Sequence, residues 1–104
     1  MLEVIEELDL GERDKAHRRA FAIRVQSAAC LTQERYEEAL SLALQSLQLF
    51  ESCQGDLDDL ASTWELLAES YRGLGDQGKA SGAQQRAEQL YQRLKAGEPG
   101  LQGA

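Results

Sequence analysis

The segment from Ala61 to Ala87 constrains the fold more than any other part of the sequence. Counted from Ala61 as position 1, an aromatic residue, a leucine, a small residue and a second aromatic residue stand at positions 4, 7, 8 and 11: Trp64, Leu67, Ala68 and Tyr71. These positions share one face of a helix. Two more small residues, Ala80 and Ala87, follow where a second helix axis could come close. We therefore expect two antiparallel helices packed as a hairpin, with the indole in its core.

This spacing resembles the tetratricopeptide repeat, a helix-turn-helix unit of 34 residues with W, L, G or A, Y, A and A at positions 4, 7, 8, 11, 20 and 27. A weaker resemblance begins at Ala20, with matches at positions 4, 17, 20 and 24: Ile23, Tyr36, Ala39 and Ala43. The alanines at position 20 of the two units are 41 residues apart, so longer helices are expected. The resemblance implies an all-α antiparallel helix-hairpin solenoid, with units at about 20–53 and 61–94 in a single domain, 1–95.

Helical periodicity predicts about four long helices and a short helix at the N-terminus. The short helix covers Met1 to Leu8 and ends near Gly11. The long helices cover about residues 14–32, 36–50, 57–74 and 77–94, and the second has the clearest amphipathic spacing. Residues 96–104 are expected to form a disordered C-terminal tail.

Three residues mark the expected helix ends. Gly55 is predicted to cap the end of the second long helix, and Asp56 is predicted to be the N-cap of the third. Gly75 follows the third helix, where it can take the left-handed conformation that glycine adopts without steric cost.

Composition supports this fold class and excludes several functions. The chain has 104 residues, 42% of them apolar, with one proline and few valines and isoleucines, which suits one helical domain. Its formal net charge of −7 makes it an acidic protein that repels phosphate, so we expect no nucleic-acid partner. The N-terminus has acids where a signal peptide needs bases, and no apolar run is long enough to span a bilayer. We expect a cytoplasmic protein with no membrane contact.

Charge is unevenly distributed over the first 24 residues. Acidic residues occupy the start of the chain: Glu3, Glu6, Glu7, Asp9 and Glu12. Basic residues follow: Arg13, Lys15, Arg18, Arg19 and Arg24. The basic cluster either faces the acidic stretch within the same molecule or faces an acidic partner. We favour the first interpretation because a charge run is usually satisfied by its surroundings and by solvent.

No arrangement of residues in the sequence indicates catalysis. His17 is the only histidine, and its neighbours one turn away, Arg13 and Phe21, make neither a metal site nor an activated base. Cys30 and Cys53 are too far apart for a CxxC motif and are expected to be small buried thiols. We therefore expect no enzymatic activity, no cofactor and no metal.

The family resemblance implies a binding function. In that family the first helices of successive units line a concave groove through positions 2, 5, 9, 12 and 13. In the first unit these positions hold Phe21, Arg24, Ala28, Leu31 and Thr32. In the second unit they hold Ser62, Glu65, Glu69, Arg72 and Gly73. The resemblance thus predicts a protein-interaction module that binds a peptide or a helical segment. Some relatives clamp a C-terminal carboxylate with an asparagine at position 9, which Ala28 cannot replace.

Two alternative functions follow from other features. Phe21, Val25 and Ala28 lie off the main apolar stripe of the first long helix. The N-terminal helix could cover them through Leu2, Ile5 and Leu8, or a partner helix or second copy could do so. The first alternative is therefore homodimerisation through the apolar surface of the first helices. The second is a peptide-sensing regulatory domain within a larger protein.

Overall fold

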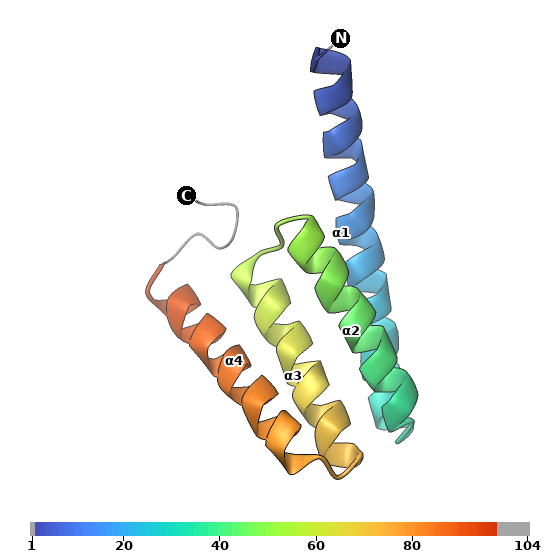
Figure 1. Cartoon of the computed structure of the whole chain (residues 1–104), viewed down its shortest axis with the longest axis vertical. Helices are drawn as coiled ribbons and strands as arrows, with labels where there is room; N and C mark the ends of the chain where they lie inside the picture. The colour runs from blue at the N-terminus through green and yellow to red at the C-terminus, as the bar shows by residue number, and fades with distance from the viewer. Residues whose placement is uncertain (1, 98–104) are drawn as a thin grey trace.

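The computed structural model describes residues 2–97, and for residues 2–10 it describes the backbone alone. Over that range the chain forms four helices and no strand: α1 (Leu2–Thr32), α2 (Tyr36–Ser52), α3 (Leu57–Gly73) and α4 (Gln77–Lys95) (Figure 1). The predicted all-α fold is confirmed. Most of the predicted disordered tail, residues 98–104, lies outside the described residues.

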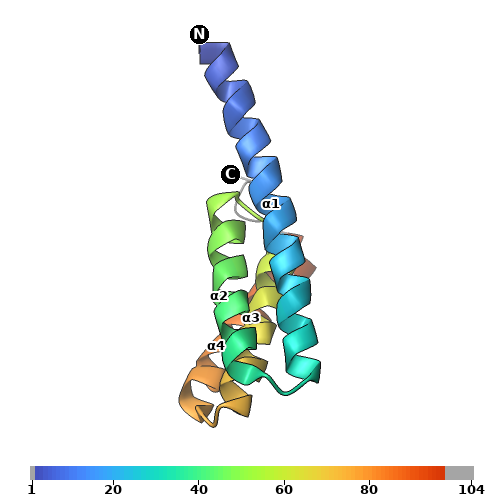
Figure 2. The same ribbon diagram turned by 90° about the vertical axis from the view of Figure 1, so that its right-hand side faces the viewer.

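The helices form two antiparallel hairpins that pack side by side. α1 packs on α2, and α3 packs on α4, while α2 and α3 join the two hairpins. Figure 1 shows α2, α3 and α4 as neighbouring rods. Figure 2, turned by 90°, shows α1 beside α2 and extending well past its end. The order of packing is that of a helical solenoid.

The prediction of a separate short N-terminal helix is wrong, because α1 runs from Leu2 to Thr32 without a break at Gly11. A glycine inside a helix costs about 1 kcal/mol relative to alanine, which weakens a helix but does not end it. Two ion pairs support the turns after Gly11: Lys15 with Glu12 at 3.7 Å, and Arg18 with Asp14. The acidic stretch therefore continues the same rod that carries the basic cluster and does not fold back against it.

The register of α1 against α2 leaves the start of α1 without a neighbour. Ser27 Oγ donates to the carbonyl oxygen of Ala39 at 2.8 Å, and Ser46 Oγ donates to that of Ala20 at 2.8 Å. In this antiparallel register the paired residue numbers add up to 66, so the last residue of α2, Ser52, lies beside about residue 14. We call residues 2–11 the overhang (Figure 2).

The overhang cannot cover the outer apolar face of α1, because both belong to one straight rod. Phe21 remains 47% exposed and Val25 remains 53% exposed, and Ala28 is also exposed. The prediction that an N-terminal helix shields these three side chains is therefore wrong. The alternative of a partner helix or a second copy stays open as a prediction.

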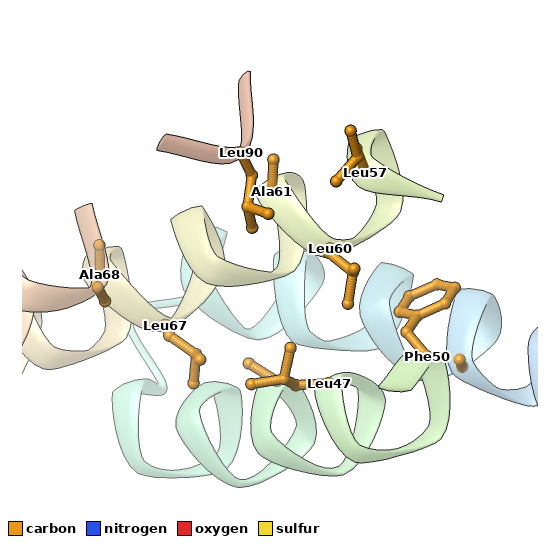
Figure 3. Close-up of a cluster of buried hydrophobic side chains, with 11 residues drawn as sticks. Leu47, Phe50, Leu57, Leu60, Ala61, Leu67, Ala68 and Leu90 are labelled. Atoms are coloured by element: carbon orange, nitrogen blue, oxygen red, sulfur yellow. The ribbon is translucent and has the colours of Figure 1, made fainter. Parts of the chain in front are cut away.

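Aliphatic and aromatic side chains from α2, α3 and α4 form the main core (Figure 3). Its largest fully buried members are Phe50, Leu57, Leu67 and Leu90. Trp64 packs against this cluster but is only half-buried, so the indole lies at the edge of the core and not at its centre. The three alanines at the predicted close approach, Ala68, Ala80 and Ala87, are all buried.

Small residues let α1 and α2 approach closely. Ala20, Ala39 and Ala43 are completely buried, and Ser27 and Ser46 lie among them with their hydroxyl groups bonded across the interface. A buried hydroxyl is tolerated here because it has a partner. Of the two cysteines, Cys30 is buried as expected, whereas Cys53 is half-buried and burial raises the pKa of its thiol.

Three helix ends share one cap geometry. The residue after the last turn takes a positive φ at Glu34 (59°), Gln54 (55°) and Gly75 (84°). In each case the next residue donates its N–H to a carbonyl five residues back, as Gly55 does to Phe50 at 2.7 Å. Gly75 thus takes the predicted left-handed conformation. The prediction for Gly55 is wrong, because Gln54 takes that conformation. Gly55 instead fits against Phe50, where an added Cβ would come within 3.1 Å of the ring.

Substitutions at two of these cap positions should change the free energy of unfolding in opposite directions. Gly75→Ala should lower the free energy of unfolding by about 1 kcal/mol, because a Cβ at positive φ is strained although it meets nothing in space. Gln54→Gly should raise that free energy by about 0.5 kcal/mol by relieving the same strain. Urea denaturation measures both changes, and an unchanged midpoint for Gly75→Ala would contradict the cap assignment.

Candidate binding groove

A concave cavity of about 370 Å³ lies between α1 and α3. α1 contributes Arg24, Val25 and Ala28, and α3 contributes four residues at helical spacing: Ser62, Glu65, Leu66 and Glu69. We call these seven residues the groove. Residues three or four apart lie on one face of a helix, so each wall repeats over successive turns. The lining combines aliphatic groups with the carboxylates of Glu65 and Glu69 and the guanidinium of Arg24.

The structure brings together five of the ten residues predicted to line the groove: Arg24, Ala28, Ser62, Glu65 and Glu69. The other five lie outside the cavity lining: Phe21, Leu31, Thr32, Arg72 and Gly73. Val25 and Leu66 were not predicted because the repeat pattern assigns neither position to the groove. Only Val25 had a signal in the sequence, its apolar spacing of four residues from Phe21.

Arg24 links the two walls of the groove. Its Nη1 donates to Ser62 Oγ at 2.5 Å, and its guanidinium carbon lies 4.8 Å from the centre of the Phe21 ring. Within residues 11–97 the Nε of Arg24 is buried and meets no acceptor. The hydroxyl of Ser62 in turn donates to the carbonyl oxygen of Asp58 at 2.9 Å. Arg24 is therefore held in place as part of the wall.

Glu65 is supported from behind by α4. The hydroxyl of Tyr91 donates to Glu65 Oε1 at 2.6 Å. Burial, and then the neighbouring carboxylate of Glu65, raise the pKa of Tyr91 to about 12. The phenol thus stays protonated and keeps donating at any physiological pH. This bond fixes one carboxylate of the groove through a residue 26 positions away.

The remaining predicted residues have other contacts. Arg72 pairs with Glu69 at 2.8 Å on the exposed surface, where such a pair contributes little to stability. Thr32 Oγ1 donates to the carbonyl oxygen of Ala29. An added Cβ at Gly73 would lie 2.1 Å from the Tyr36 ring, so α2 already occupies the space beside this glycine. Leu31 is half-buried.

The only histidine serves as a structural contact. His17 Nε2 lies 3.1 Å from Asp59 Oδ2, and its ring meets Phe50 edge-on with centroids 5.5 Å apart. This joins α1 to both α2 and α3 near the start of the bundle. Among residues 11–97 no cluster of His, Cys, Asp and Glu side chains could hold a metal ion. Among residues 2–97 no helix is both long and apolar enough to cross a bilayer.

Two helix hairpins whose first helices line a shared groove define a helical repeat protein of the interaction-module class. The tetratricopeptide repeat family model matches residues 18–93, so the chain belongs to the tetratricopeptide repeat family. All of the overhang lies outside the match. No match was found among curated proteins or among solved structures.

Proposed function

We propose that this chain is a protein-interaction module that takes a peptide or a helical segment of a partner into the groove. The observation that carries this proposal is the open cavity of about 370 Å³ between α1 and α3, the first helices of the two hairpins. That volume is at the lower end of the range for ligand pockets, about 300–1,000 Å³. It suits a few side chains of a short segment better than a folded surface.

The polar groups of the groove point to the kind of side chain that enters it. Arg24 already bonds to Ser62, Glu65 accepts from Tyr91, and Glu69 pairs with Arg72. A ligand that displaced these partners would leave the displaced groups without a hydrogen-bond partner. The free energy lost in this way would exceed the free energy gained from a new bond to the ligand. Binding energy should therefore come from apolar side chains placed on Val25, Ala28 and Leu66. An amphipathic helix supplies such anchors at spacings of three and four residues.

A non-catalytic role belongs to the same proposal. The family consists in general of interaction modules. The charged groups of the groove are engaged in structural pairs, so none is presented as a nucleophile or a general base.

Ala28→Arg should block the groove. The alanine is exposed and lines the cavity, so a long charged side chain there would fill it while the helix tolerates the change. Peptides selected on the wild-type chain from a displayed random library should bind Ala28→Arg at least about tenfold more weakly, a loss of about 1.4 kcal/mol. Fluorescence anisotropy with labelled peptides measures the affinity, and circular dichroism checks the helix content.

Ala29→Arg is the matched control. Ala29 is the next residue of α1, is also exposed and does not line the groove. This variant should bind the selected peptides as tightly as the wild type. Equal loss of affinity in both variants, or no loss in either, would show that the peptides bind elsewhere and would overturn the proposal.

A further inference from the structure

The overhang is a helix that its own bundle leaves unpartnered. α2 ends beside residue 14, and the family match begins only at residue 18. Residues 2–10 include five large aliphatic types in the sequence: Leu2, Val4, Ile5, Leu8 and Leu10. A helical stretch of about ten residues is marginal in water without packing. A covering element would therefore stabilise this part of α1.

The charges along α1 indicate what that element is. Residues 2–12 carry five acidic side chains and no basic one, whereas residues 13–24 carry five basic side chains and one acidic one. α1 is therefore acidic over residues 2–12 and basic over residues 13–24. Two copies of α1 placed antiparallel bring the acidic stretch of each beside the basic stretch of the other. A parallel arrangement would place like charges together, which is unfavourable.

One face of α1 suits this pairing. Steps of three or four residues back from Val25 reach Phe21, Arg18, Asp14, Gly11, Glu7 and Val4. The described members of this outer face are exposed, and the face lies opposite the buried Ala20 and Ser27. In an antiparallel pair centred between residues 12 and 13, residue numbers in contact add up to 25. Position 7 then meets position 18, position 11 meets position 14, and position 4 meets position 21.

We propose that two copies of this chain associate through the outer face of α1, antiparallel and centred between residues 12 and 13. Gly11 stands near the centre, where an added Cβ would meet nothing and two helix axes could come close. The pairing would cover the exposed ring of Phe21, and it leaves the two bundles at opposite ends of the paired helices. It uses a different surface from the groove, apart from the shared rim at Val25.

Charge reversal on one half of α1 tests the pairing. At high micromolar concentration and low salt, sedimentation velocity of the wild-type chain should give twice the monomer mass of 11.5 kDa. Glu6→Lys with Glu7→Lys should raise the dimer dissociation constant at least about tenfold. Each Glu→Lys substitution changes the charge by +2, so the double variant has a net charge of −3 in place of −7. The dimer should weaken although this change reduces the general repulsion between two copies. Arg18→Glu with Arg19→Glu should cause the same loss.

Combining the four changes should restore the dimer. The combined variant has the wild-type net charge with the signs at positions 6, 7, 18 and 19 exchanged, so the four reversed positions are again opposite in charge across the antiparallel pair. Helix content by circular dichroism should be equal in all these chains. A monomeric wild type, or a combined variant that stays as weak as its two parents, would overturn the proposal. An equally stable dimer in every variant would place the contact elsewhere and would overturn it as well.

Two controls separate this pairing from the groove. Glu37→Lys with Glu88→Lys makes the same charge change on exposed residues of α2 and α4 and should leave the dimer intact. Ala28→Arg should lose peptide binding and still dimerise, whereas Glu6→Lys with Glu7→Lys should bind the selected peptides normally. Loss of the dimer in the Glu37 and Glu88 variant would show that charge reversal acts nonspecifically, and the pairing would be rejected.

Discussion

Replacing Phe50 with alanine should lower the free energy of unfolding by about 3–5 kcal/mol, as truncation of a fully buried aromatic side chain does. The ring is completely buried at the C-terminal end of α2. It meets His17 of α1 edge-on and lies against the turn at Gly55, where a Cβ would come within 3.1 Å of it. The cavity would open where three segments meet, so relaxation cannot fill it easily.

The measurement for Phe50→Ala is urea denaturation followed by circular dichroism. A domain of this kind has a total stability of about 5–15 kcal/mol, so the variant should be close to unfolding at room temperature. Leu44→Ala is the control on the same helix, because Leu44 is 41% exposed and should cost less than about 1 kcal/mol. Equal costs for the two variants would contradict the position assigned to the ring.

Ala39→Leu should lower the free energy of unfolding by about 3 kcal/mol, the upper end of the usual cost of overpacking. Ala39 is completely buried between α1 and α2, and its carbonyl oxygen accepts the bond from Ser27 at 2.8 Å. Three added carbons would push the helices apart and stretch this bond and the matching bond from Ser46 to Ala20. The two contacts should therefore weaken together.

Differential scanning calorimetry of Ala39→Leu checks this expectation, with Ala29→Leu as the matched control. Ala29 is exposed on α1, so the same change there meets no opposing helix and should alter the melting temperature little. A melting temperature of Ala39→Leu equal to that of the wild type would show that α1 and α2 are more loosely packed than the buried alanines indicate.

Trp64 shows how far a repeat pattern can be trusted at a single residue. The pattern correctly identifies the helix and the face on which the indole lies. The indole packs against the core cluster. The side chain is nevertheless half-buried, because these two hairpins have no third hairpin over that side within the described residues. Truncation of Trp64 should therefore cost less than truncation of Phe50, which no repeat position singled out.

The sequence by itself determined the all-α fold, the α3–α4 hairpin and the left-handed cap at Gly75. These depend on periodicity and local backbone preference, which are readable along a single segment. Only the tertiary structure decided that α1 runs unbroken through Gly11, that Arg24 bonds to Ser62, and that Tyr91 supports Glu65. Such contacts join residues more than 25 positions apart. Helical spacing assigns a residue to a face, whereas the offset between two packed helices sets which residues of those faces meet.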